Sequence, residues 1–294
     1  LRGKEAGLFV PAGSQANLIS LLVHVPRGEE VVAGAESHCI RFEAGSGAAL
    51  AGVQFAMIPG DGRYTARDLE AHLHERTLHT PGTALVWIEN THNMGGGTIF
   101  PFAEMKAVSG LARGKGIPVH VDGARIMNAA IATGIPAREW ASLADSISFC
   151  LSKGLGAPVG SVLTGTRSFV DDARRSRKRL GGAMRQAGVI AAAGIYALDH
   201  NVDRLAEDHA AARSLAEGLA TLPGIAVDPG SVETNIVMAA SMVVDARRLA
   251  KAAAVRGVLF HPFGPVRMRF VTHLDVPAVM IPEALRRLRE ALAA

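Results

Sequence analysis

Short apolar runs alternate with helical patterns over the first two-thirds of the chain, and this alternation restricts the possible folds more than any other feature. The apolar runs predict strands at Glu30–Ala33, Val53–Ile58, Ala84–Glu89, Pro118–Asp122, Ser146–Leu151 and Gly160–Thr164. Apolar residues at helical spacing predict helices between them, at Ser14–His24, Ala66–Glu75, Phe102–Lys115 and Ala124–Thr133. Such strands, separated by helices, predict an α/β fold with a mostly parallel sheet covered on both faces.

The pattern changes near residue 200, which divides the chain into two predicted domains. Residues 201–294 combine amphipathic helices with short strands such as "NIVMAA" and "VRMRFV", so we expect a small C-terminal α+β domain there and a large domain over residues 1–200. No apolar run approaches the roughly 18 residues that a membrane span needs. Cys39 and Cys150 lie in apolar contexts without metal-ligand spacing, which favours a reducing cytoplasm with no disulfides and no metal.

Positive charge is concentrated in "RRSRKR", residues 174–179, although the formal net charge of the chain is only +4. Such a run is a weak indication of nucleic-acid binding. Aromatic residues make up only 5% of the chain and none is interleaved with the run, so no platform for stacking bases is expected. We therefore interpret the run as a solvated helix face or a site for anions such as phosphate, and expect no nucleic-acid partner.

One segment, "PVHVDGARIMNAA" at residues 118–130, places a carboxylate at the end of an apolar strand. Asp122 ends the strand and Gly123 follows, after which apolar residues recur at helical spacing. The carboxyl ends of strands are where α/β sheets bind ligands. The alternative is that Asp122 simply caps the helix that follows.

Three further features point to the same edge of the predicted sheet. Lys153, in "SISFCLSKGLGAPVG", follows a strand and precedes glycines that let a ligand approach closely. Among apolar neighbours its amine is a candidate nucleophile, although an exposed loop lysine is the simpler alternative. Gly13 and Ser14 begin a helix whose free N–H groups suit an anion. His38 follows another strand, where a purely structural role is the alternative.

Together these groups match a single ligand. The helix start at Gly13 and Ser14 suits a phosphate, Lys153 suits an aldehyde, and Asp122 suits a basic ring nitrogen whose flat ring His38 can cover. Pyridoxal phosphate (PLP) has these parts, and proteins hold it through a lysine Schiff base and an acidic partner for its ring nitrogen. We therefore predict that the chain binds PLP, and that Asp122 keeps the ring protonated.

The chain resembles the L-threonine aldolases within the fold-type I PLP-dependent enzymes. The resemblance runs from residue 3 to the C-terminus and rests on five ordered motifs: "IENTHNMGGG", "HVDGARIMNA", "CLSKGLGAPVGSVL", "GGAMRQAGVIAAAGIYAL" and "RFVTHLDV". It implies an aspartate aminotransferase-like large domain, a small C-terminal domain and a homotetramer built from tight dimers. The family pattern also includes an "RSDT" motif ahead of "GKEAGLFVP", and residue 1 of this chain lies after the position of that motif.

The resemblance also implies roles for individual residues. It assigns Lys153 to the Schiff base, Gly13 and Ser14 to the phosphate, Asp122 to the ring nitrogen and His38 to the ring face. The remaining residues that it singles out act on the substrate or the cofactor: Arg125 and Arg269 on the substrate carboxylate, Arg125 and Lys178 near the cofactor, Arg185 on a phosphate across the dimer interface, and His79 near the substrate β-hydroxyl. His92 is expected to be structural.

The reaction implied is cleavage of L-threonine or L-allo-threonine to glycine and acetaldehyde, with His38, His79 or a water molecule as the base. Two alternatives remain open from the sequence. A β-eliminating lyase or an amino-acid racemase would use the same scaffold and break a different bond. A homologue without activity would act as a binding or assembly protein.

Overall fold

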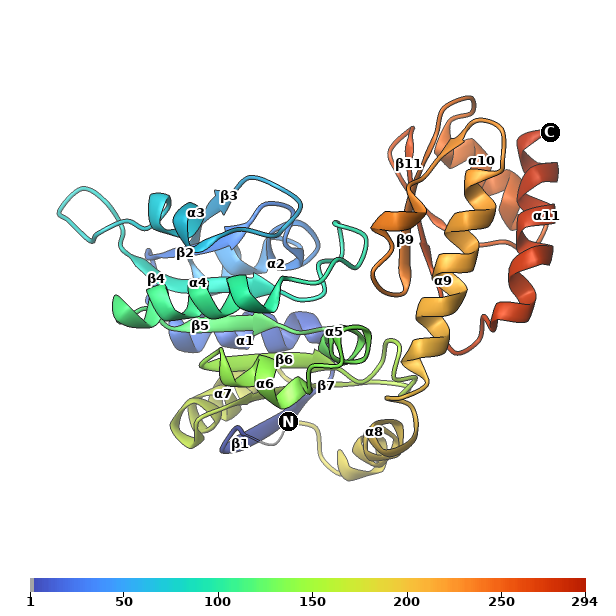
Figure 1. Cartoon of the computed structure of the whole chain (residues 1–294). Helices are drawn as coiled ribbons and strands as arrows, with labels where there is room; N and C mark the ends of the chain where they lie inside the picture. The colour runs from blue at the N-terminus through green and yellow to red at the C-terminus, as the bar shows by residue number, and fades with distance from the viewer. Residues whose placement is uncertain (1–2) are drawn as a thin grey trace. The chain divides into compact units, whose positions relative to one another are not determined.

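The computed structural model describes residues 3–294, which form two compact units. The first unit extends to Met94 and resumes over Ile99–Val202, and the second consists of Gly95–Thr98 and Asp203–Ala294. Each unit has its own sheet (Figure 1). Across the described residues, no helix is both long enough and apolar enough to cross a membrane.

The first unit is built on a seven-stranded sheet of order β1-β7-β6-β5-β4-β2-β3. Its strands are β1 (Ala6–Val10), β2 (Glu30–Gly34), β3 (Gln54–Ile58), β4 (Thr83–Glu89), β5 (Val119–Asp122), β6 (Ser146–Cys150) and β7 (Ser161–Gly165). Neighbours from β3 to β6 are parallel, whereas β7 is antiparallel to both β6 and β1. Every residue of β2, β5 and β6 is buried, as the apolar runs predict for strands covered on both faces.

The helices of this unit lie on both faces of the sheet. They are α1 (Gly13–His24), α2 (His38–Arg41), the π-helical turn η1 (Gly47–Ala51), α3 (Ala66–Ala71), α4 (Phe102–Gly114), α5 (Ile126–Thr133), α6 (Ala137–Ser142), α7 (Arg167–Arg179) and α8 (Gly188–His200). Apolar residues of α1 and α7 pack with those of β1 and β7 in one buried cluster. The helices α4 and α6 cover the other face (Figure 1). There the rings of Phe102 and Trp140 pack edge to face, with their centres 4.9 Å apart.

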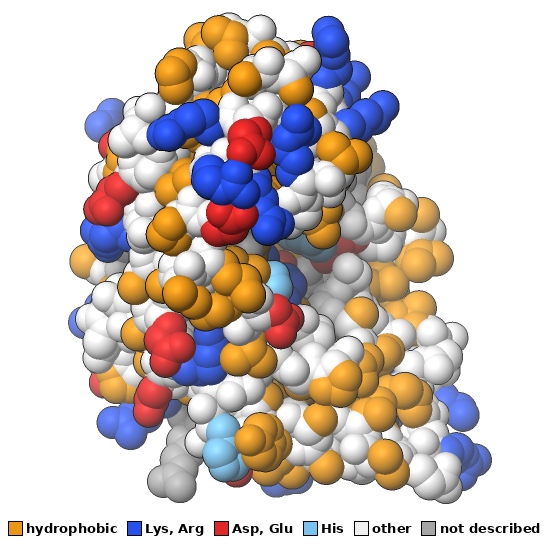
Figure 2. Space-filling view, turned by 90° about the vertical axis from the view of Figure 1, so that its right-hand side faces the viewer, with side chains coloured by type: hydrophobic (Ala, Val, Ile, Leu, Met, Phe, Trp, Pro, Cys, Tyr) orange, Lys and Arg blue, Asp and Glu red, His pale blue; other side chains and the backbone are white. Residues whose placement is uncertain are grey.

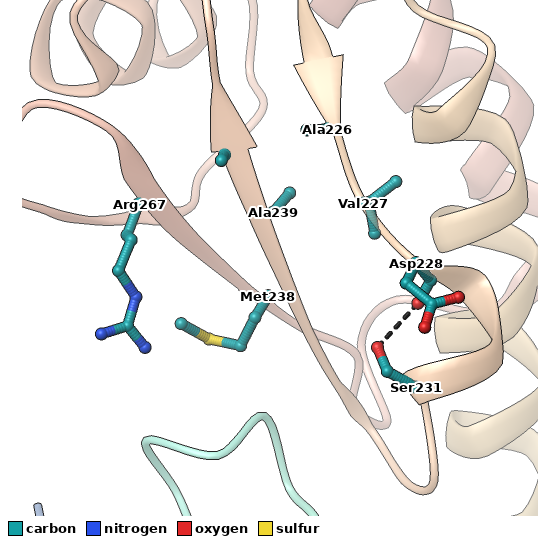
Figure 3. A pocket seen from close by; sticks show the side chains of 8 residues that line it. Ala226, Val227, Asp228, Ser231, Met238, Ala239 and Arg267 are labelled. Carbon is teal, nitrogen blue, oxygen red and sulfur yellow. Dashed lines mark hydrogen bonds between the residues drawn. The ribbon is translucent and has the colours of Figure 1, made fainter. Parts of the chain in front are cut away.

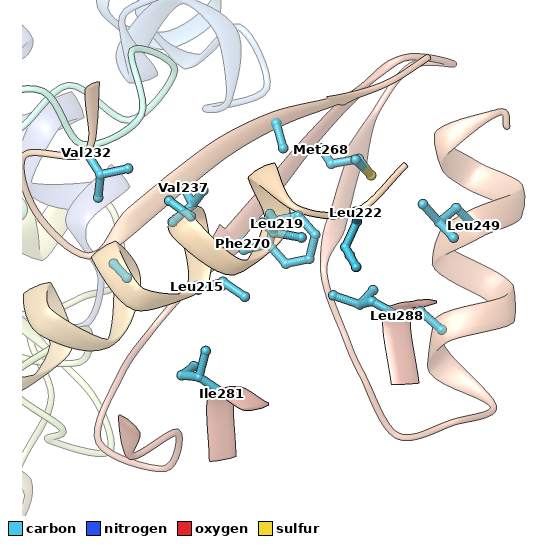
Figure 4. Packing of buried hydrophobic residues seen from close by; sticks show 14 of the residues in the cluster. Leu215, Leu219, Leu222, Val232, Val237, Leu249, Met268, Phe270, Ile281 and Leu288 are labelled. Atoms are coloured by element: carbon cyan, nitrogen blue, oxygen red, sulfur yellow. The ribbon is translucent and has the colours of Figure 1, made fainter. Parts of the chain in front are cut away.

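The second unit is a four-stranded antiparallel sheet packed against helices, an α+β arrangement. Its elements are α9 (Leu205–Ala220), β8 (Ile225–Ala226), η2 (Pro229–Ser231), β9 (Ile236–Ser241), α10 (Ala246–Ala254), β10 (His261–Phe263), β11 (Arg267–Val271), η3 (Ala278–Met280) and α11 (Ile281–Leu292). The strand order is β10-β11-β9-β8. Its core joins the inward side chains of β9 and β11 to the three helices (Figure 4), and Phe270, Leu219 and Leu288 belong to this one cluster.

Most predicted elements are confirmed, with shifts of a few residues at their ends. The helix α3 begins with a capping box formed by Thr65 and Asp68, and it ends at Ala71 instead of the predicted Glu75. The basic run belongs to α7, and the side chains of Arg174, Arg175, Lys178 and Arg179 are exposed, which confirms a solvated helix face. The sequence did not predict β1, because this short strand is defined by pairing with β7, more than 150 residues away.

Two histidines, the partly buried His24 at the C-terminal end of α1 and the buried His120 of β5, lie on either side of one hydroxyl group. The hydroxyl of Ser146 is 2.7 Å from a ring nitrogen of His24 and 2.7 Å from one of His120. Burial lowers the pKa of His24 to about 4 and that of His120 well below its usual value. Both rings are therefore neutral in the folded protein at pH values where an unfolded chain protonates them.

This pair predicts a loss of stability in mild acid. Because the unfolded state binds the extra proton, the free energy of unfolding falls as the pH drops from about 6.5 towards 4, by about 3 kcal/mol from His24 alone. Urea titrations at pH 7 and pH 5, between which about 2 kcal/mol of this fall is expected, measure it, with the fluorescence of Trp87 and Trp140, both in the first unit, as the signal. His24→Gln should lose clearly less stability over this range than the wild type. Equal losses in the two proteins would contradict the assignment.

Candidate active site

The carboxyl ends of β4, β5 and β6 meet at one edge of the large sheet. Asp122, the last residue of β5, is in register with Glu89 at the end of β4 and with Ser148 in β6. The start of α1 reaches the same edge, since a Cβ atom added to Gly13 would lie 3.0 Å from the Cys150 sulfur at the end of β6. Lys153 follows β6 after a two-residue bend. The fold thus brings Gly13, Asp122 and Lys153 to one edge.

The Asp122 carboxylate is buried and held by two hydrogen bonds. One oxygen accepts the N–H of Ala124 at 3.1 Å, and the other accepts the side-chain amide of Asn17 at 2.8 Å. The helix α5 begins later, at Ile126, with Arg125 as its N-cap residue. The alternative that Asp122 caps this helix is therefore wrong, because the carboxylate binds the preceding turn and a residue of α1.

His38 lies beside Asp122 and is paired with a second buried carboxylate. Its Nδ1 is 2.9 Å from Oε1 of Glu43. The side chain of His38 is 28% exposed, whereas that of Glu43 is 1% exposed. One ring nitrogen of His38 and one carboxylate oxygen each of Glu43 and Asp122 all lie within 4.8 Å of one another. Glu89 holds the backbone here, accepting the N–H groups of His38 at 2.6 Å and Asn93 at 2.8 Å.

Arg125 lies near the turn that follows β6 and carries Lys153. Arg125 and Gly154, the residue after Lys153, line the same small cavity with Cys150. Burial lowers the pKa of the Arg125 guanidinium, although the nearby charges of Cys150, Glu89 and Asp122 oppose the effect. The carbonyl of Lys153 accepts the N–H of Gly156 at 2.8 Å, which closes the turn that carries the lysine.

The start of α1 is free to bind an anion. Its N-cap residue is Ala12, which offers no side-chain hydrogen bond to the first turn, and the side chain of Ser14 is exposed. Helix starts of this kind attract anions through their N–H groups and dipole. The loop after α7 approaches this point, because a Cβ on Gly182 would collide with the side chain of Gln15.

Three predicted residues lie at the surface of the first unit. Lys178 is exposed on α7, and Arg185 is exposed in the loop between α7 and α8. His79 lies in an exposed turn closed by Thr77 and Thr80, ahead of β4 and thus at the opposite edge of the sheet. Within one chain the structure does not bring His79 to Asp122. His92 is buried 3.9 Å from Glu89 and packs against Gly62, as expected of a structural residue.

Arg269 belongs to β11 in the second unit, on the face opposite the buried Met268 and Phe270. Its guanidinium carbon lies 5.3 Å from the ring centre of Phe263. Arg267, two residues earlier on the same face, borders a groove with Met238 and Ser231 (Figure 3).

Elsewhere, exposed apolar side chains are scattered among charged ones, as Figure 2 shows for one side of the molecule.

Sequence reasoning missed three residues of this site. Asn17 lies inside an amphipathic helix, and Glu43 and Glu89 looked like ordinary acidic residues near element ends. Their importance comes from contacts over 26 to 105 residues along the chain, which no local pattern records. The only local signal was the position of Glu89 at the end of a buried strand.

The residues present fit PLP. A free helix start suits its phosphate, a buried carboxylate suits its ring nitrogen, and a lysine at the same edge suits its aldehyde carbon. The close approach of Gly13 to Cys150 places the helix start directly against the strand that leads to Lys153. His38, partly exposed beside Asp122, can lie against the ring.

Comparison with known proteins agrees with this geometry. The family model described as beta-eliminating lyase matches residues 1–257. The chain is 41% identical to a protein of Arabidopsis thaliana named probable low-specificity L-threonine aldolase 2, covering 97% of this chain and 82% of that protein. It is also 41% identical to the low specificity L-threonine aldolase of Escherichia coli K12, covering 100% of this chain and 86% of the relative.

Solved structures with the same fold include PLP enzymes. The threonine aldolase of Leishmania major matches with a TM-score of 0.82 at 23% identity, over 98% of this chain and 84% of that one. A structure of SPT with PLP matches with a TM-score of 0.74 at 20% identity, over 98% of this chain and 73% of the other. These likenesses confirm the fold-type I architecture predicted from the sequence.

The packing of Gly13 yields a test of the anion site. Gly13→Ala should weaken PLP binding about tenfold, because the added Cβ pushes the start of α1 away from Cys150 and misaligns its N–H groups. Equilibrium titration of the cofactor-free protein with PLP measures the affinity. Gly114→Ala is the control, since a Cβ there meets no atom within 4 Å. Unchanged affinity in Gly13→Ala would move the phosphate away from α1.

Proposed function

The chain belongs to the beta-eliminating lyase family, and from this premise we propose that it is a PLP-dependent, low-specificity threonine aldolase. It cleaves L-threonine, L-allo-threonine and related β-hydroxy amino acids to glycine and an aldehyde. The observation that carries the proposal is the meeting of α1, Asp122, His38 and the Lys153 turn at one sheet edge. The likeness to threonine aldolases, which covers 97% or more of this chain, supports this reaction over others on the same fold.

When bound, PLP supplies an aldehyde carbon that combines with amino groups and a ring that accepts electrons from the bond being broken. The residues of the chain prepare this chemistry. Lys153 would hold the aldehyde carbon. Asp122 holds a proton on the ring nitrogen, while Gly13 and Ser14 bind the phosphate. Arg185, assisted by Lys178, contacts a phosphate of the neighbouring subunit.

The substrate is held by its carboxylate and activated at its β-hydroxyl. Arg125 and Arg269, the arginines that the resemblance to threonine aldolases assigns to the carboxylate, would hold it in one orientation and so favour cleavage of the Cα–Cβ bond. His38 removes the hydroxyl proton, because a neutral imidazole is a suitable base near pH 7. His79 is the less favoured base, since its own chain places it at the opposite edge of the sheet.

We propose that the active enzyme is a cytoplasmic homotetramer of tight dimers. The free cysteines Cys39 and Cys150, both buried, suit a reducing compartment. The exposed position of Arg185 allows it to reach a second subunit. A site completed by a partner residue would be active only in the assembled dimer.

The first test of the function is the identity of the attachment residue. The wild type with PLP should absorb in the visible, and borohydride should abolish the band and leave the cofactor mass on the peptide containing Lys153. Lys153→Ala should lose the band and cleave threonine at least roughly a thousandfold more slowly, as expected when a covalent nucleophile is removed. Lys115→Ala, at the C-terminal end of α4, is the control.

Product analysis decides between this function and its alternatives. Glycine and acetaldehyde from threonine support the aldolase, whereas ammonia and a keto acid would indicate β-elimination. Conversion of L-threonine to its Cα epimer without cleavage would indicate a racemase. A wild-type protein that forms no visible band with PLP would overturn the enzyme proposal altogether.

The carboxylate clamp predicts an effect on which bond breaks. Arg269→Ala removes a charged hydrogen-bond partner, which typically costs a few kcal/mol, or roughly ten- to a few hundred-fold in rate. We expect kcat for threonine cleavage to fall and exchange of the α-proton of glycine to gain share, because orientation acts in the transition state. Cleavage and exchange are measured side by side in deuterated water.

Arg267→Ala is the matched control for this experiment. It removes the same group from the same face of β11, two residues away. Its ratio of cleavage to exchange should equal that of the wild type. If Arg269→Ala also leaves kcat and this ratio unchanged, Arg269 does not set the geometry of the substrate.

A further inference from the structure

Asn17 joins two buried carboxylates through one amide group. Its Nδ2 donates a hydrogen bond to Glu43 Oε1 at 2.7 Å and another to Asp122 Oδ2 at 2.8 Å, which uses both of its hydrogens. The hydroxyl of Ser148 donates to Asn17 Oδ1 at 3.3 Å, which is consistent with this orientation of the amide. Asn17 is only 2% exposed, so its side chain has little freedom to turn.

Glu43 also forms a hydrogen bond with His38. The same Oε1 that accepts from Asn17 lies 2.9 Å from Nδ1 of His38. Its second oxygen, Oε2, is buried without a hydrogen-bond partner among residues 3–294. A buried carboxylate with one unsatisfied oxygen destabilises a fold, and such groups call for a functional explanation. A purely structural residue would gain by being apolar.

We propose that Glu43 is a positioning residue of the aldolase: with Asn17 it fixes the ring of His38 so that Nδ1 carries the hydrogen and Nε2 faces the substrate as the proton acceptor. This inference rests on the proposed function. A carboxylate that accepts from one ring nitrogen of a histidine sets the tautomer and leaves the other nitrogen basic. Asn17 ties that orientation to Asp122, the partner of the cofactor ring.

The charges around His38 come from three elements. Burial, the largest single effect, lowers the pKa of His38, but the hydrogen bond to Glu43 and the charges of Asp122, Glu43 and Glu89 together outweigh it, so the net shift of this pKa is upward. These carboxylates extend from the loop after α2, from β5 and from β4. Burial also raises the pKa of Glu43; Asp122 adds to this rise, whereas the hydrogen bonds from His38 and Asn17 oppose it.

The test replaces the carboxylate by an amide of the same shape. Glu43→Gln keeps an oxygen for Asn17 and for Nδ1 but removes the charge, so the pKa of His38 should fall by about one unit. Nuclear magnetic resonance of the histidine rings measures this titration in the cofactor-free protein. Because the base must be neutral, the acid limb of the kcat profile for threonine should move down with the pKa, while kcat at its plateau falls about tenfold.

A second histidine–glutamate pair provides the matched control. Glu30 Oε1 lies 2.8 Å from Nδ1 of His74, at the start of β2 and thus at the opposite edge of the sheet. Glu30→Gln makes the same chemical change there and should leave the His38 titration, the pH profile and kcat unchanged. Glu43→Asp should restore part of the acid-limb position, because it restores the charge.

Several outcomes would overturn the proposal. One is a folded Glu43→Gln protein that titrates at His38 like the wild type. Another needs no variant: nitrogen chemical shifts of wild-type His38 that place the hydrogen on Nε2 instead of Nδ1. A wild type with the Nδ1–H form that nevertheless fails to cleave threonine would contradict the aldolase function and leave the Glu43 contact intact, so the two failures are distinguishable.

Discussion

The burial of two carboxylates within reach of one amide is the constraint on which the site depends. Two negative charges at this spacing repel, and each loses solvation on burial. Asn17 offsets part of this cost by donating to both, and His38 offsets more by pairing with Glu43. The remaining stabilisation must come from packing in the surrounding sheet and helices. Every residue of the neighbouring strands β5 and β6 is buried.

The helix α1 connects the parts of the site. Its first residue, Gly13, packs against the end of β6, and its first turn offers N–H groups to an anion. One turn later Asn17 faces inward and binds Glu43 and Asp122. At the other end His24 contacts Ser146 and stacks on Phe169 at 4.6 Å. Because the helix is rigid, its anchoring at both ends also fixes where the amide lies.

Local patterns were enough to predict the groups that we propose bind the cofactor. Asp122 and Lys153 each follow an apolar strand and precede glycine, and the start of α1 shows a glycine before helical spacing. These signals are confined to a few neighbouring residues, as is the alternation that predicted the parallel sheet. The resemblance to threonine aldolases added the arginines, whose roles no local pattern defines.

The supporting residues were beyond the reach of the sequence for a physical reason. Asn17 and Glu43 act through contacts between elements far apart in the chain, so their meaning appears only once β5 and α1 are side by side. The edge strand β1 was missed for the same reason. His79 shows the converse, since the resemblance to threonine aldolases assigned it a role near the substrate but its own chain places it in an exposed turn.

The energetic character of the site argues against a chain that serves only for binding or assembly. Glu43 buries an unsatisfied oxygen, and Arg125 buries a guanidinium whose pKa burial lowers. Each of these features destabilises the folded state relative to an apolar side chain of similar volume. An assembly protein requires neither, because its partner surfaces are on the outside. A catalyst does require them, since charged groups held in fixed positions away from water act most strongly on charge that develops during a reaction. The residues that destabilise the fold are therefore those placed where chemistry on a cofactor would need fixed charges.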